Sequence, residues 1–201
     1  MGKIFDADIW TAASAVLILA SAVFASFLVS LYATDRYKGN KRKTAVFFIG
    51  ISFFTALALL CFFGFAAITV KGIILSLVLV FSSYEDIKAR ECDDYLHLMI
   101  VIAALIGAEV SSIPYMLISG VFIGGLMLLP VILTKSTVGG ADIKTAAACS
   151  FLLGLNRGII GLLVGTVLAV AFNILKKDKS KGFPMIPYLA VGYMAAYFIQ
   201  I

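Results

Sequence analysis

The sequence carries little charge for its length. Of its 201 residues only 13% are Asp, Glu, Lys or Arg, and 62% are hydrophobic, whereas soluble domains have about 25% charged and about 45–50% apolar residues. So few polar side chains cannot cover a surface that faces water. The composition therefore excludes a cytoplasmic enzyme, a disordered chain and a disulfide-rich secreted module. Because lipid requires each crossing segment to satisfy its own backbone hydrogen bonds, the long apolar runs predict an all-α integral membrane protein.

Cysteine and histidine are scarce as well. The three cysteines are far apart and form no Cys-x-x-Cys pair: Cys61, Cys92 and Cys149. Their number and spacing support neither a disulfide framework nor a zinc site. His97 is the only histidine, and because no second ligand stands beside it we expect a hydrogen-bonded structural residue. We therefore expect no metal and no cofactor, and the sequence contains no nucleic-acid-binding motif.

Apolar runs without charge indicate where the chain crosses the membrane. A helix needs ~20 residues to cross a hydrocarbon core of ~30 Å. The runs predict a polytopic protein of about eight transmembrane helices, at residues 9–33, 45–69, 72–90, 94–109, 112–134, 140–156, 158–175 and 184–200. We expect two parts. Residues 1–70 form two N-terminal helices joined by a short basic cytoplasmic loop, and residues 71–201 form a six-helix core.

Basic residues are distributed unevenly between the two sides of the predicted membrane. With the N-terminus outside, the outer side holds only Lys3, Lys71 and Arg157. The cytoplasmic side holds Arg36, Lys38, Lys41, Arg42, Lys43, Lys88, Arg90, Lys135, Lys144, Lys176, Lys177, Lys179 and Lys181. Lysine and arginine concentrate on the cytoplasmic side of membrane proteins. The bias therefore predicts a multi-pass protein of the cytoplasmic membrane, with Asp86 and Asp142 at its cytoplasmic face.

Two short apolar runs draw these carboxylates toward the membrane boundary. Gly72–Tyr84 has 13 residues and Thr145–Asn156 has 12, too few to cross unless the helices extend through Asp86 and Asp142. Ionisable groups at such positions are functional candidates. Two carboxyl groups that share a site hold one proton between them. One can then activate a water while the other, protonated, polarises a peptide carbonyl.

Three ordered segments surround these residues. They read Asp86-Ile87-Lys88-Ala89-Arg90, Gly139-Gly140-Ala141-Asp142-Ile143-Lys144 and Phe183-Pro184-Met185-Ile186-Pro187-Tyr188-Leu189-Ala190. They resemble the motifs D-[IL]-x-x-R, G-x-G-D-[IV]-K and P-F-x-P-[FY]-L-A of the prepilin leader peptidases, membrane aspartic proteases that process type IV prepilins and archaeal preflagellins. The resemblance extends over about residues 70–200 and implies that Asp86 and Asp142 are the catalytic pair. The other matched positions, which would bind substrate or support the site, are Gly139, Gly140, Ala141, Lys144, Arg90, Pro184 and Pro187.

The resemblance implies an endopeptidase that removes a short basic leader from prepilin-like or archaellin-like precursors at the cytoplasmic face. These precursors and the lipid bilayer are the expected partners. The chain departs from the family pattern at Ala141, which replaces the second glycine of G-x-G-D, and at Cys92-Asp93-Asp94, where Ile-Pro-Asn is usual. Many bacterial members carry a cytoplasmic Cys-x-x-Cys domain linked to N-methylation after the first span. Here only Asp35–Lys43 follows that span, so we expect no methyltransferase activity.

Other interpretations of the two carboxylates stay open at this point. Either Asp could be an interfacial residue paired with Lys88, Arg90 or Lys144. In a small ion- or proton-coupled transporter the same carboxylates would bind a cation, although such carriers often have inverted repeats and the sequence has no convincing internal repeat. A non-catalytic scaffold of a pilus or secretion assembly would also keep the fold. The substrate, the oligomeric state and the bacterial or archaeal source do not follow from the sequence.

Overall fold

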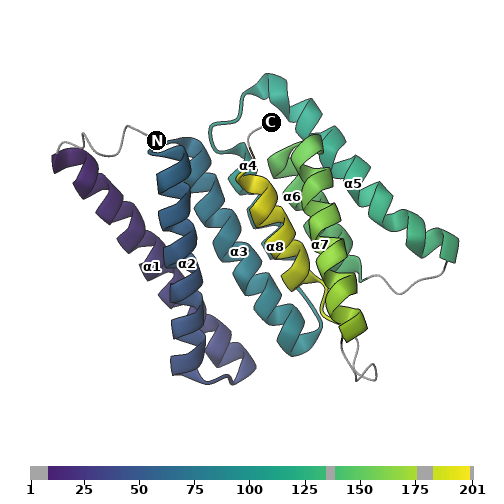
Figure 1. Ribbon diagram of the computed structural model, residues 1–201, viewed down its shortest axis with the longest axis horizontal. Coiled ribbons are helices and arrows are strands. Elements are labelled where there is room, and N and C mark those ends of the chain that lie inside the picture. Colours follow the sequence, from purple (N-terminus) through teal and green to yellow (C-terminus); the bar gives the residue numbers. More distant parts are fainter. Residues whose placement is uncertain (1–8, 135–138, 176–182, 200–201) are drawn as a thin grey trace. The chain divides into compact units, whose positions relative to one another are not determined.

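The computed structural model describes residues 9–134, 139–175 and 183–199 (Figure 1). Within these ranges the regular structure is entirely helical, with eight α-helices and one short 3-10 helix, η1. The chain divides into two compact units, residues 1–81 and 82–201. The predicted all-α fold is confirmed. The predicted boundary between residues 70 and 71 divides the two N-terminal helices from the expected six-helix core. It concerns function rather than compactness, and it stays a prediction.

The first unit contains α1 (Ile9–Tyr37), α2 (Lys41–Phe63) and the first part of α3 (Ala67–Ala89). α1 and α2 pack against each other, and they diverge toward the start of α1 (Figure 1). Only residues 38–40 connect them. The side chain of Asn40 accepts a hydrogen bond from the third backbone N–H of α2, which caps that helix, since the first N–H groups of a helix have no partner within it.

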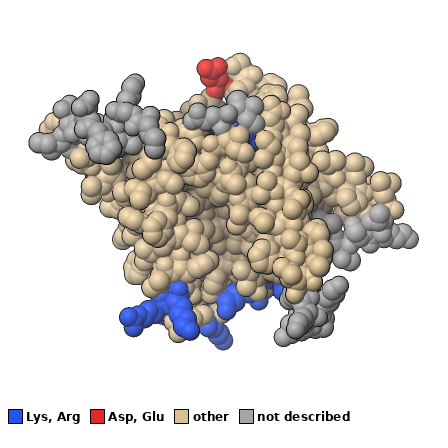
Figure 2. Space-filling model, in the orientation of Figure 1, with Lys and Arg blue, Asp and Glu red and all other residues tan. Residues whose placement is uncertain are grey.

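Exposed Lys and Arg side chains gather at this turn, where α1 meets α2 (Figure 2). They are Arg36, Lys38, Lys41, Arg42 and Lys43. The basic turn carries part of the charge bias that predicts the orientation. Lys135 and the lysines of residues 176–181, which carry another part, lie outside the described residues.

The second unit is organised around α6. It contains the end of α3, η1 (Val110–Ser112), and the helices α4 (Asp94–Leu105), α5 (Ile113–Thr134), α6 (Gly140–Leu153), α7 (Leu155–Leu175) and α8 (Ile186–Tyr197). α6 packs against α4, α5, α7 and α8 (Figure 1). α6 as a whole is therefore held by four neighbouring helices.

Glycines bring the helices of this unit close together. A Cβ atom on Gly124 of α5 would lie 3.2 Å from Cβ of Ala147 on α6. A Cβ atom on Gly192 of α8 would lie only 2.3 Å from the carbonyl oxygen of Gly161 on α7. Small residues at such interfaces let transmembrane helices approach closely. The packing of α8 on α7 consequently depends on the absence of side chains at this crossing.

Within the described part of the chain, five helices are long and apolar enough to cross a membrane: Trp10–Tyr37, Lys41–Phe63, Ala67–Ala89, Val110–Leu133 and Leu155–Leu175. The chain is therefore a multi-pass membrane protein. The expected count of eight spans is not confirmed. α4, α6 and α8 have 12, 14 and 12 residues, and at ~1.5 Å per residue they reach ~18–21 Å, less than the ~30 Å core.

Candidate functional site

Asp86 lies in the last turn of α3 and is buried, with 8% of its surface exposed. Its Oδ2 accepts a hydrogen bond of 3.0 Å from the backbone N–H of Ile186, the first residue of α8. The N–H groups in the first turn of a helix have no partner within the helix and point toward an acceptor placed there. The start of α8 therefore holds a carboxylate that is 100 residues away in the sequence.

Two prolines flank this contact. Pro184 lies in the segment that precedes α8, and Pro187 occupies the second position of the helix. Proline fits the first turn because its missing N–H would have no helical partner there. Nearby, the ring of Phe183 stacks on that of Tyr188, with 5.0 Å between centroids. Both prolines therefore belong to the segment that presents the Ile186 N–H to Asp86.

Asp142 lies in the first turn of α6, outside the five helices that are long enough to cross the membrane. Its side chain is half-buried. Burial raises the pKa of the Asp142 carboxyl to about 6; the Asp86 carboxylate also raises it, and a backbone hydrogen bond with Gly139 opposes the rise. Desolvation and a like charge both disfavour the ionised form of a carboxyl group. The two carboxyl groups are thus close enough to interact electrostatically.

The two glycines before Asp142 have different surroundings. A Cβ atom on Gly139 would lie 2.9 Å from Oδ2 of Asp142, whereas a Cβ atom on Gly140 would meet nothing within 4 Å. Gly139 caps α6 and accepts a backbone hydrogen bond from Asp142. The Asp142 carboxylate therefore occupies the space that a side chain at position 139 would fill.

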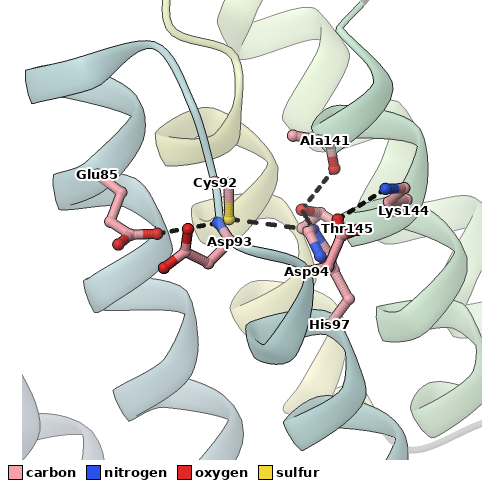
Figure 3. Close-up of polar contacts among 8 residues, drawn as sticks. All are labelled: Glu85, Cys92, Asp93, Asp94, His97, Ala141, Lys144 and Thr145. Carbon is pink, nitrogen blue, oxygen red and sulfur yellow. Dashed lines mark hydrogen bonds and ion pairs between the residues drawn. The ribbon is translucent and has the colours of Figure 1, made fainter.

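Not all of the remaining motif residues interact with the two carboxylates. Arg90 follows α3 with a φ of 60°, is exposed, and acts electrostatically on Asp86. Lys144 forms an ion pair of 2.6 Å with Asp94 of α4 rather than with Asp142 (Figure 3). The carbonyl of Ala141 accepts a hydrogen bond from a side chain one turn later on α6. Lys144 thus links α6 to α4, whereas the Ala141 carbonyl accepts a hydrogen bond within α6 itself.

Sequence reasoning missed the partners that surround this pair. The backbone N–H of Ile186 carries no side-chain signal in the sequence. Glu85 is fully buried beside Asp86 in the chain, and its Oε2 accepts a hydrogen bond of 3.2 Å from the backbone N–H of Asp93 (Figure 3). In the sequence, the only feature that could have drawn attention to Glu85 was its position next to Asp86, among several acidic residues. Glu85 links the end of α3 to the segment that leads into α4.

His97 is hydrogen-bonded, as expected for a structural histidine. Its Nε2 lies 3.0 Å from the hydroxyl oxygen of Thr145. Within the described residues, no group of three or more His, Cys, Asp or Glu side chains is arranged to hold a metal ion. In the connection between α3 and α4, burial raises the pKa of the Cys92 thiol to about 11, so that this thiol is protonated at neutral pH.

Comparison with known proteins identifies the family. The model of the type IV leader peptidase family matches residues 73–174, just over half of the chain, and this region contains both Asp86 and Asp142. Comparisons with curated proteins and with solved structures found no significant match. The family model and the crossing helices agree with the resemblance of the sequence motifs. The chain is a multi-pass membrane peptidase that belongs to the type IV leader peptidase family.

Proposed function

We propose that this peptidase removes the short basic leader from type IV prepilin-like or archaellin-like precursors at the cytoplasmic face of the membrane. The observation that carries the proposal is the arrangement of Asp86 and Asp142. They come from distant parts of the matched region, and the carboxylate of one raises the pKa of the other. Such coupling is what a pair of carboxyl groups needs to hold one proton near neutral pH.

The chemistry follows from a pair with one proton. The ionised carboxylate takes a proton from a water molecule, whose oxygen attacks the carbonyl carbon of the scissile peptide bond. The protonated carboxyl group donates a hydrogen bond to the carbonyl oxygen, where negative charge develops. The tetrahedral intermediate then collapses, and a proton passes to the departing amine. Because the two groups titrate together, the shared proton belongs to the pair rather than to one residue.

The position of the pair along the helices supports cleavage near the membrane boundary. Asp86 lies in the last turn of a helix long enough to cross the membrane. The connection after this helix and the turn between α1 and α2 fall on the same predicted side, which is rich in Lys and Arg. Basic loops favour the cytoplasmic side. A substrate with a cytoplasmic leader and an apolar helix after it would present its cleavage site at this depth.

We expect no N-methyltransferase activity. In many bacterial relatives that activity is linked to a cytoplasmic domain after the first span. Here only residues 38–40 separate α1 from α2. Methylation of the new N-terminus after cleavage would contradict this part of the proposal.

Cleavage of a prepilin-like substrate by the purified, detergent-solubilised protein tests the proposal. We expect the wild type to release the leader, and Asp86→Asn and Asp142→Asn each to lower kcat/KM by about 1,000-fold, since positioned acids and bases contribute ~10²–10⁴-fold. Glu109→Gln is the matched control, because Glu109 is exposed and precedes η1. Full activity in either Asp variant would contradict the pair. Failure of the wild type to cleave would favour a transporter or scaffold.

A further inference from the structure

Two side-chain contacts join the start of α6 to α4, both at residues that closely follow Asp142 in the sequence (Figure 3). At the surface, Nζ of Lys144 donates to Asp94 over 2.6 Å. In the interior, Nε2 of His97 lies 3.0 Å from Oγ1 of Thr145. His97 is 8% exposed and Thr145 is 1% exposed. One contact is exposed and the other is buried, so their removal should cost different amounts of stability.

The hydrogen-bond roles in the buried contact follow from the hydroxyl group. Oγ1 of Thr145 donates its single hydrogen to the carbonyl oxygen of Ala141, at 2.9 Å. The hydroxyl oxygen can then only accept from His97. With the hydroxyl hydrogen directed at Ala141, Nε2 of His97 carries a hydrogen and donates it to Thr145. The contact therefore requires a side chain at position 97 with a hydrogen-bond donor at the place of Nε2.

His97 also faces the segment that follows Asp86. Its Nε2 lies 4.0 Å from Sγ of Cys92, in the connection between α3 and α4 (Figure 3). The same ring thus lies between the chain that leaves Asp86 and the helix that carries Asp142. Thr145 is three residues after Asp142, and residues three apart lie on the same face of a helix.

The first turn of α6 has no side-chain cap of its own, because Gly139 occupies the N-cap position. Its orientation consequently depends on contacts with other helices. A buried polar group that loses its partner costs more than an exposed ion pair, whose contribution is commonly small. The buried contact between His97 and Thr145 is therefore expected to support this turn more than the exposed ion pair between Lys144 and Asp94 does.

We propose that His97 is a positioning residue, which holds the first turn of α6 through Thr145 and thereby keeps Asp142 in reach of Asp86. The proposal rests on the proposed function of the two carboxylates. His97 takes no part in the chemistry. It fixes the separation of the two groups that share a proton.

Two substitutions of His97 distinguish positioning from general packing. The amide nitrogen of a glutamine can take the place of Nε2, whereas the amide of an asparagine ends near Nδ1 and falls short of Thr145. We expect His97→Gln to retain kcat within about threefold and His97→Asn to lower kcat more than about tenfold, with KM unchanged, because misplaced reacting groups can cost ~10²-fold. Equal kcat values for the two variants would overturn the proposal.

Thr145 provides a second pair of variants. Thr145→Ser keeps the hydroxyl group and Thr145→Val replaces it with a methyl group of similar size. We expect Thr145→Ser to resemble the wild type and Thr145→Val to resemble His97→Asn. In the double variant His97→Asn/Thr145→Val the two losses should not multiply, since residues in one contact are non-additive. Losses that multiply would show that the two residues act separately, against the proposal.

Cross-linking tests the positioning role of His97 without any measurement of peptidase activity. Its result is therefore independent of whether the protein cleaves prepilins. In a chain without native cysteines, cysteines at positions 86 and 142 are joined by a short thiol-reactive reagent. We expect His97→Gln to leave the rate of cross-linking unchanged and His97→Asn to lower it severalfold. Equal rates would overturn the positioning role even if the enzyme cleaves. A difference in rates would support it even if no prepilin is cleaved.

Discussion

Gly139 and Gly140 are adjacent in the sequence, yet only one of them touches the candidate site. The space above Gly139 holds the Asp142 carboxylate, and the space above Gly140 is open. The motif resemblance predicted for both glycines that they bind substrate or support the site. The structure adds a distinct reason for Gly139, namely that a side chain there would displace the carboxylate of a candidate catalytic residue.

We predict that Gly139→Ala lowers kcat more than about tenfold without unfolding the protein. Alanine can adopt the φ of −65° at this position, so the effect comes from a Cβ atom that would lie 2.9 Å from Oδ2 of Asp142. Real side chains do not tolerate such a distance, and the carboxylate, at the end of a short side chain, would move. The measurement is cleavage of a prepilin-like substrate together with a melting curve in detergent.

The matched control is Gly140→Ala, one residue later. A Cβ atom at position 140 meets nothing within 4 Å, and alanine is ~1 kcal/mol more favourable than glycine within a helix. We therefore expect activity within about threefold of the wild type and an unchanged or higher melting temperature. Equal losses in the two variants would show that the contact with Asp142 is not the cause.

At the residue scale, the sequence predicted where the acids lie but not what holds them. Asp86 and Asp142 could be located because two apolar runs are too short to cross a membrane unless their helices extend through these residues. The hydrogen bond from Ile186 to Asp86 joins residues 100 positions apart, and that from His97 to Thr145 joins residues 48 apart. Neither contact leaves a local pattern, since each depends on how whole helices pack. The catalytic roles of the two acids stay a prediction.

At the scale of the helices, glycine decides how closely α8 lies against α7. Gly161 and Gly165 of α7 face Gly192 of α8, and a Cβ atom on Gly192 would lie 2.5 Å from the backbone nitrogen of Gly165. Gly161 and Gly165 thus serve helix packing. Because α8 also carries the N–H that holds Asp86, this crossing supports the candidate site.

We predict that Gly192→Ala lowers the melting temperature in detergent by several degrees and reduces cleavage more than about tenfold. The added methyl group meets backbone atoms, which cannot rotate away, so the two helices must separate; such overpacking typically costs ~1–3 kcal/mol. Gly125→Ala on α5 is the control, because nothing lies within 4 Å of the position. A Gly192→Ala protein as stable as the control would contradict this packing.

The lengths of the helices show the limit of reasoning from apolar runs. Such runs predicted that the spans continue to residues 109 and 156, because a helix must be long enough to cross the hydrocarbon core. In the structure α4 ends at Leu105 and α6 ends at Leu153, and glycines with positive φ follow at Gly107 and Gly154. Glycine adopts this left-handed conformation readily and commonly ends helices. The local backbone preference thus ended the helices before the apolar runs did.

At the scale of the whole molecule, composition was the strongest predictor. Low charge and long apolar runs predicted an all-α membrane protein. The prediction is confirmed by the described residues, which include five helices long and apolar enough to cross a membrane. Composition carries no information about which helix ends meet. The ordered motifs predicted that the end of α3 and the start of α6 meet, and both Asp86 and Asp142 fall in the region that matches the leader peptidase family.

The proximity of Asp86 and Asp142 is the central claim, and cross-linking measures it most directly. Cys61, Cys92 and Cys149 are first replaced, and cysteines are introduced at positions 86 and 142. We expect a short thiol-reactive reagent to join them efficiently. Ile87 is the matched control, since it is the next residue on α3 and is 54% exposed. Efficient cross-linking of 86 to 142 with little of 87 to 142 is the predicted result; no cross-link between 86 and 142, or equal yields for both pairs, would contradict the account.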